Sequence, residues 1–244
     1  MTDTISGVIP FDHSDRDGSG LVEWEALDPA NLDSGEPIQR GKIYDEDQSS
    51  GYMSGLWDCT AFVDRPGPYA VDEFMFLLEG TVVMGLPDGT EVTINAGEAF
   101  VLPKGLDCHW KMPGYVRKVF MIVDDPILEG ATNPSLSRVT KPDLSLVSSS
   151  SENSVDLTDE IFRNSAGTMT VSITVSSGGR SANETPVAHE LLHVLSGTYS
   201  VSDAKGTHSF GPGDTFYLPR GTSIDRELAP GTRYLTAKHA PKMS

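Results

Sequence analysis

The string HELLH at residues 189–193 has the H-E-x-x-H form of zinc-dependent metalloproteases. In that chemistry two histidines, one helical turn apart, bind the zinc ion, and the glutamate between them activates a water molecule. His189, Glu190 and His193 would therefore form a hydrolytic zinc site if residues 186–200 were helical. The elements around the motif decide whether they are.

An internal repeat places this segment in a strand. The stretch EFMFLLEGTVVM at 73–84 aligns with ELLHVLSGTYSV at 190–201, and GEAFVLPKG at 97–105 aligns with GDTFYLPRG at 213–221. The aligned stretches lie about 116 residues apart along the chain, and a repeat of this length indicates two copies of one domain. HELLH thus corresponds to DEFMF of the first copy.

Each copy is predicted to be all-β. No segment of ten or more residues shows a strong 3.6-residue apolar period, and the apolar runs are short and rich in β-branched and aromatic residues. PDGT, NAGE and PKG supply turns between them. We expect a small closed barrel or jelly roll per copy, with first-copy strands over residues 52–63, 73–84, 90–94, 98–102, 106–111 and 116–123.

On a strand the HELLH histidines cannot share a zinc ion. Four residues at about 3.3 Å each put His189 and His193 roughly 13 Å apart. If Glu190 faces the barrel interior, the two-residue alternation of a strand turns both histidines outward. We expect them to be surface or interface residues.

The repeat also sets the predicted domain boundaries. Residues 42–125 form domain 1 and residues 156–244 form domain 2. The stretch 126–155 between them contains PDLSLVSSSSENSVD, whose polar, serine-rich composition is typical of a linker. Residues 1–41 lie outside the repeat, are acidic and contain Gly and Pro, so we expect an extended N-terminal arm.

Composition excludes several classes of protein. With a net charge of −17 over 244 residues, the chain would repel a nucleic-acid backbone or an anionic membrane. Its start, MTDTISGVIPFDHSD, has neither the basic nor the apolar region of a secretory signal. Two cysteines are too few for a disulfide scaffold and fit a reducing compartment. We expect a cytoplasmic protein.

The repeated motifs resemble those of the cupins. EFMFLLEG looks like the end of the first cupin motif, and GEAFVLPKG and GDTFYLPRG look like the second. The longer stretch GLWDCTAFVDRPGPYAVDEFMFLLEG is similar to the EutQ-like cupins, a subgroup that includes the (S)-ureidoglycine aminohydrolase-type domains. The resemblance implies a bicupin, with two RmlC-like jelly-roll barrels in one chain.

Cupins often bind a metal through an HxH pair, a glutamate and a further histidine. Carried over by position, the glutamate falls on Glu73 in copy one and Glu190 in copy two. The HxH pair falls near residues 66–68 and 181–185, which contain no histidine, and the last ligand falls on Cys108 and Ile224. One carboxylate, even with a thiolate, is too small a ligand set for a transition metal. We therefore expect no metal cofactor.

The candidate site lies in copy one, with Glu73 as general acid or base in an apolar barrel. Period-two alternation and the repeat alignment select the predicted ligand-binding residues Trp57, Cys59, Met75, Cys108, His109, Trp110 and Arg117. Two of these choices have structural alternatives. The cysteines align with apolar residues of copy two, which fits buried small hydrophobes, and Arg117 fits a structural ion pair as well as a carboxylate clamp.

Copy two has a more apolar lining, and its Arg226 could neutralise Glu190. Glu73 has no such partner visible nearby in the sequence, although Arg117 could reach it. A ligand should therefore bind in copy one. We predict a bicupin, monomeric or homodimeric, that binds a small polar metabolite. It is either an enzyme acting on a nitrogen-containing or carboxylated compound, or a catalytically silent binding or scaffold protein.

Overall fold

The computed structural model describes residues 7–13, 20–127, 134–144 and 155–241. Strands dominate these residues, and their helices are short 3₁₀ turns: η1 (Pro29–Asn31), η2 (Gln48–Ser50) and η3 (Pro134–Ser137). The all-β prediction is confirmed. None of the helices in the described ranges is long and apolar enough to cross a membrane.

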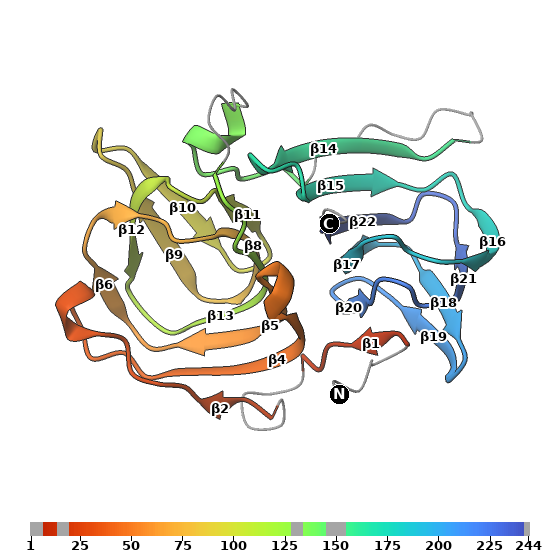
Figure 1. Ribbon diagram of the computed structural model, residues 1–244, viewed down its shortest axis with the longest axis horizontal. Coiled ribbons are helices and arrows are strands. Elements are labelled where there is room, and N and C mark those ends of the chain that lie inside the picture. The colour runs from red at the N-terminus through yellow and green to blue at the C-terminus, as the bar shows by residue number, and fades with distance from the viewer. Residues whose placement is uncertain (1–6, 14–19, 128–133, 145–154, 242–244) are drawn as a thin grey trace. The chain divides into compact units, whose positions relative to one another are not determined.

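The chain divides into two compact units, one drawn mainly in orange to green and the other mainly in teal to blue with its strand β1 (Ile9–Pro10) in red in Figure 1. The first unit is drawn from Ser14–Asp143 and Arg163–Gly167. The second is drawn from Met1–His13, Leu144–Phe162 and Thr168–Ser244. The segment 1–41, predicted as an arm, is thus shared between the units: its described residues 7–13 belong to the second unit and 20–41 to the first.

Two antiparallel sheets build the first unit. One has the strand order β11-β8-β13-β5-β4-β2 and the other β10-β9-β12-β6-β3, with β7 also paired to β12. The bounds of the first sheet are β2 (Val22–Glu23), β4 (Gln39–Asp47), β5 (Tyr52–Cys59), β8 (Asp72–Glu79), β11 (Ala99–Leu102) and β13 (Val116–Val123). Those of the second are β3 (Leu32–Ser34), β6 (Phe62–Asp64), β7 (Gly67–Pro68), β9 (Thr81–Gly85), β10 (Glu91–Asn95) and β12 (Asp107–Met112).

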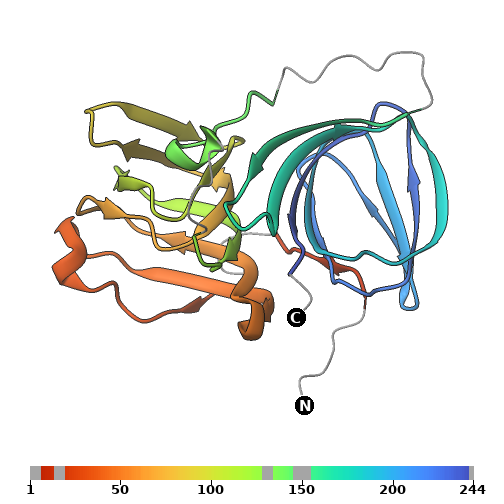
Figure 2. The same ribbon diagram turned by 45° about the horizontal axis from the view of Figure 1, so that its top comes forward.

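The second unit repeats this plan. Its sheets have the orders β1-β20-β17-β22-β15-β14 and β16-β21-β18-β19. Figure 2 shows these strands curving around one interior. Their bounds are β1 (Ile9–Pro10), β14 (Leu157–Arg163), β15 (Met169–Val175), β16 (Gly179–Glu184), β17 (His189–Ser196), β18 (Tyr199–Asp203), β19 (Gly206–Phe210), β20 (Thr215–Leu218), β21 (Ile224–Leu228) and β22 (Arg233–His239).

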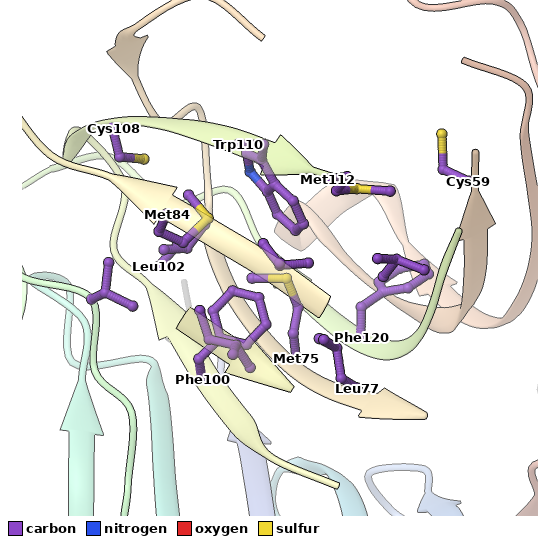
Figure 3. Packing of buried hydrophobic residues seen from close by; sticks show 14 of the residues in the cluster. Cys59, Met75, Leu77, Met84, Phe100, Leu102, Cys108, Trp110, Met112 and Phe120 are labelled. Atoms are coloured by element: carbon purple, nitrogen blue, oxygen red, sulfur yellow. The ribbon is translucent and has the colours of Figure 1, made fainter. Parts of the chain in front are cut away.

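The pairing order confirms the repeat, because β11-β8-β13-β5-β4 matches β20-β17-β22-β15-β14 strand for strand. Each unit also has its own core. In the first, alternate residues from both sheets meet between them, and Figure 3 shows Met75, Phe100 and Trp110 among the packed side chains. Two sheets closing over a shared apolar interior are the jelly-roll arrangement expected of a cupin.

HELLH lies in strand β17, which pairs with β20 and β22, so the strand prediction is confirmed. Leu192 and Val194 belong to the second core, which places His193 on the opposite face of the strand. Of the two positions expected for the histidines, surface or interface, the surface is wrong for His193, which is 3% exposed and whose Nδ1 lies 2.8 Å from Thr215 Oγ1. Burial lowers the pKa of His193 to about 3, so the ring is neutral at physiological pH.

Candidate functional site

Glu73 has a partner inside the first barrel, and it is Lys118. The two residues lie on the neighbouring antiparallel strands β8 and β13. Lys118 Nζ is 2.8 Å from Glu73 Oε1, and the side chains are only 6% and 4% exposed. Both charges have therefore left bulk water, and each depends on the other for its stabilisation. The prediction that Glu73 lacks a nearby partner is wrong.

Aromatic rings surround the Lys118 ammonium group. Its Nζ lies 4.7 Å from the ring centroid of Trp57 and 4.7 Å from that of Trp110. Met75 Sδ is 3.1 Å from the same nitrogen. A cation over an aromatic face is attracted by the negative potential of the ring, most strongly at a desolvated site. Both tryptophans thus stabilise Lys118 as an ammonium ion.

Tyr69 completes the set by donating a hydrogen bond from its hydroxyl to Glu73 Oε2. Backbone hydrogen bonds hold Tyr69 against the PKG turn: its N–H donates to the Leu106 carbonyl at 2.9 Å, and its carbonyl accepts from the Gly105 N–H at 2.7 Å. Burial, and then the adjacent Glu73 carboxylate, raise the pKa of Tyr69 well above its ordinary value. Tyr69 is therefore a neutral hydrogen-bond donor at physiological pH.

A cavity of about 230 Å³ lies in front of these groups. Strands of the barrel supply one part of its wall, and the segment around η1 supplies the other. The lining residues are Leu27, Asp28, Asn31, Leu32, Trp57, Phe62, Asp64, Tyr69, Trp110 and Lys118. Lys118 and Tyr69 face the cavity, whereas Glu73 lies behind them, bonded to both.

The structure brings together part of the predicted site. Trp57 and Trp110 line the cavity, and Met75 contacts Lys118. Glu73 takes the inward position predicted for it, but Lys118 and Tyr69 occupy its oxygens. A ligand in the cavity would therefore meet the lysine and the tyrosine first.

The two cysteines are buried in the core of the first unit, and Figure 3 shows their thiols well apart. Burial raises the pKa of Cys59 to about 12 and that of Cys108 to about 12. Thiolate is the reactive form of cysteine, so neither side chain is a nucleophile near neutral pH. Of the two interpretations left open for them, the buried hydrophobe fits better.

His109 and Arg117 point away from the cavity. The His109 ring lies over Gly85 on the neighbouring strand, where an added Cβ would come within 2.2 Å of it. Arg117 is buried with its Nη1 4.0 Å from Glu79 Oε1. In the second unit, Arg233 at the equivalent position donates to the Leu144 carbonyl. These contacts fit the structural alternative for Arg117.

The second barrel holds its glutamate differently. Glu190 lies 3.3 Å from Arg226 Nη2 and 2.9 Å from Lys238 Nζ, which confirms the predicted Arg226 contact. Trp110 and Lys118 align with Arg226 and Tyr234 in the repeat. The first barrel therefore has the Trp110 ring on β12 and the Lys118 cation on β13. The second barrel has the Arg226 cation on β21, the equivalent of β12, and the Tyr234 ring on β22, the equivalent of β13.

Comparison with known families fits this geometry. Residues 47–120 and 164–236 each match the EutQ-like cupin domain family, and together they make up more than half of the chain. This chain belongs to the EutQ-like cupin family. Because the domain occurs twice, the protein is a bicupin, as the repeat predicted. A search among curated proteins finds no significant match to this bicupin.

Solved structures share the fold of the bicupin along most of its length. A protein of unknown function from Pseudomonas syringae pv. tomato matches with a TM-score of 0.69 at 18% identity, covering 96% of this chain and 99% of its own. A putative glyoxylate-induced protein from Pseudomonas aeruginosa matches with a TM-score of 0.63 at 16% identity, covering 100% and 91%. A putative dioxygenase from Nostoc punctiforme gives 0.61 at 13%, covering 98% and 84%. At these identities the likeness concerns the fold alone.

The cupin glutamates of the bicupin are engaged with protein cations. Within the described part of the chain, no group of three or more His, Cys, Asp or Glu side chains is placed to hold a metal ion. Each cupin glutamate is instead bonded to a protein cation: Lys118 for Glu73, and Arg226 and Lys238 for Glu190. A cation and a metal ion would compete for the same carboxylate oxygens.

Sequence reasoning missed Lys118, Tyr69 and Asp64. Two of them carried a signal, since Lys118 shares its strand face with Val116 and Phe120, and Asp64 shares its face with Phe62. A charged side chain on the apolar face of a strand indicates a buried partner or a function. Tyr69 lies in a connection between strands, where no periodic pattern points to it.

Proposed function

We propose that the first barrel binds a small polar metabolite, with the Lys118 ammonium group donating a hydrogen bond to a carbonyl or carboxylate oxygen of the ligand. The observation that carries this proposal is the position of Lys118, which is 5% exposed yet lines the cavity. Buried lysines are rare in proteins, and a charge in an apolar environment is more often kept for function.

Size and lining support a small ligand. The volume of about 230 Å³ lies below the range of about 300–1,000 Å³ typical of sites for drug-sized molecules. Trp57, Phe62, Tyr69 and Trp110 give the wall its apolar area, and Lys118 and Asp64 give it charge. Apolar walls with a few fixed polar groups are the usual composition of a metabolite site.

Glu73 acts in this proposal as a positioning residue. It holds the ammonium group of Lys118 and the hydroxyl of Tyr69 in fixed places, so both are preorganised for a ligand. The contacts among Glu73, Lys118 and Tyr69 also favour a second candidate function, that of an enzyme. Lys118 would then act as the general acid: one N–H bond of its ammonium group breaks as the substrate accepts the proton, and the neutral amine regains a proton from solvent after the reaction.

Lys118 further supports binding without a transition metal. Its positive charge takes the role toward Glu73 that a metal ion has toward the cupin glutamate in metal-binding relatives. We therefore expect ligand binding to be unaffected by prior treatment of the protein with a chelator.

A thermal-shift screen of polar metabolites, run on metal-free and metal-loaded protein, tests the proposal. A ligand at 100 times its dissociation constant stabilises the native state by about 2.7 kcal/mol, which raises the melting temperature measurably. We expect hits among small carbonyl or carboxylate compounds, and their shifts should be equal in both preparations. Shifts that appear only after metal loading would contradict the proposal. Incubation of each hit with the protein, followed by product analysis, separates binding from turnover.

A further inference from the structure

Asp64 is a second charged group on the cavity wall, and it comes from a different sheet than Lys118. It ends strand β6, between β3 and β12, and its Oδ1 accepts a hydrogen bond from the Trp110 N–H. Its carboxylate thus sits against the backbone of the tryptophan whose ring covers Lys118. The residue is half-buried and faces the cavity.

No cation of the described residues neutralises Asp64. Lys118 also faces the cavity, but its charge is paired with Glu73 at 2.8 Å. Arg65, the next residue along the chain, donates to the Leu32 carbonyl instead. Asp28, which lines the cavity as well, is another acid. The wall therefore carries a surplus of negative charge near Asp64.

Four aromatic side chains line the same cavity: Trp57, Phe62, Tyr69 and Trp110. Aromatic faces attract cations, and quaternary and primary ammonium ligands are commonly held between such rings and a carboxylate. A partly desolvated carboxylate without a neighbouring cation is costly unless a ligand supplies the opposite charge. The Asp64 carboxylate and these aromatic rings together form a site suited to a cationic nitrogen group.

We propose that Asp64 is a specificity-determining residue that recognises a positively charged nitrogen group, such as an ammonium or amidinium, at the end of the ligand opposite Lys118. This inference rests on the proposed function, in which Lys118 binds the oxygen-bearing end. The ligand class is then a short compound with a cationic nitrogen at one end and a carbonyl or carboxylate at the other.

The pH dependence of binding follows from the groups that face Asp64: Tyr69, Lys118 and Asp28 across the cavity, and Cys108 on β12. Burial raises the pKa of Asp64 to about 6. Tyr69 and Cys108 have raised pKa values and stay protonated between pH 5 and 8. Recognition of a cation requires the ionised carboxylate, so binding should strengthen as the pH rises through about 6. A variant with Asp28→Asn controls for the other acid.

Binding calorimetry with matched pairs of compounds tests Asp64. The probes are glycine, β-alanine and 4-aminobutyrate, each compared with the isostere in which a methyl group replaces the ammonium group: propanoate, butanoate and pentanoate. At pH 7.5 we expect at least one amino compound to bind about 10- to 100-fold more tightly than its isostere, as a charge-assisted hydrogen bond provides. This advantage should vanish in Asp64→Asn, whose amide oxygen can still accept from the Trp110 N–H, and should fade below pH 6.

The outcomes separate this inference from the proposed function. An ammonium advantage that persists in Asp64→Asn, or no advantage in any pair, overturns the role of Asp64. If the carboxylate isosteres still bind, and lose binding in the double variant Glu73→Gln with Lys118→Met, the proposed function stands without it. If neither series binds to the wild-type protein, both the role of Asp64 and the proposed carboxylate recognition are wrong.

Discussion

Replacing Lys118 with Met lowers the free energy of unfolding of the first barrel by about 3–5 kcal/mol, the usual cost of removing one partner of a buried ion pair. Methionine fills a similar volume, so the loss comes mainly from the charge. It would leave the Glu73 carboxyl group, at 3% exposure, without its cation and with the Tyr69 hydroxyl still bonded to it. Trp57 and Trp110 would also lose the cation that lies 4.7 Å from each ring.

Tryptophan fluorescence can follow this loss in the first barrel alone. The chain contains 3 tryptophans, Trp24, Trp57 and Trp110, and all lie in the first unit. Urea unfolding monitored by their emission therefore reports on that unit. Because the protein has two units, the transition should be fitted as the unfolding of one unit and not of the whole chain.

The double variant Glu73→Gln with Lys118→Met is the matched control. It removes both charges and so leaves neither of them buried without its partner. We expect it to be more stable than Lys118→Met alone. If the single and the double variants unfold at the same urea concentration, Lys118 and Glu73 do not depend on each other and the ion pair is not the structural basis of the site.

Replacing Gly80 with Ala should have a comparable effect on the same unit. Gly80 joins β8 to β9 with a φ of +83°, and an added Cβ would lie 2.1 Å from the Tyr115 carbonyl oxygen. The left-handed conformation costs about 1–2 kcal/mol for an alanine. Forcing backbone atoms apart in a packed region adds about 1–3 kcal/mol. The glycine of the EG motif is thus required for close approach of two backbone segments.

Gly89→Ala separates these two costs. Gly89 has the same φ of +83° in the turn between β9 and β10, but nothing lies within 4 Å of an added Cβ. We expect Gly89→Ala to lose about 1–2 kcal/mol and Gly80→Ala clearly more, in the same urea experiment. Equal losses would mean that the Gly80 backbone moves away from Tyr115 without cost.

The sequence predicted the fold well because its strongest signals are repeated. The motif pairs around Glu73 and Glu190 fix equivalent strands in both copies, and the pairing orders of the sheets agree with that alignment. The same alignment correctly placed HELLH in a strand, against the helix that the motif alone would suggest. The register of a strand follows from its hydrophobic pattern and its turns, and turn types follow from the residues in them, so both can be predicted from a single sequence.

The site was predicted less completely because it depends on contacts between strands far apart in the sequence. Glu73 and Lys118 are 45 residues apart, and the local sequence around either one shows no partner. Arg226 was predictable as the partner of Glu190 because it stands where copy one has Trp110. The segment around η1 gave no such signal. Its residues Leu27 and Leu32 line the cavity, and the pairing of β3 with β6 places Leu32 opposite Asp64.

Burial was the second property that the sequence did not reveal. His193 faces away from the second core, as alternation predicts, but it is nevertheless buried at 3% exposure. Cys59 and Cys108 share inward faces with tryptophans, which made them candidate ligand contacts, yet both lie in the core. The face of a strand follows from its period, whereas the cover over that face comes from other elements of the fold.

Binding calorimetry on Glu73→Gln and Glu190→Gln tests the central claim most directly, using a metabolite that stabilises the wild-type protein in the thermal-shift screen. Both variants neutralise the cupin glutamate of one barrel and keep its shape. The account predicts that Glu73→Gln weakens binding about 10-fold or more, because Lys118 and Tyr69 lose the group that positions them, while Glu190→Gln binds as the wild type does. Binding lost in Glu190→Gln and retained in Glu73→Gln would contradict the account and move the site to the second barrel.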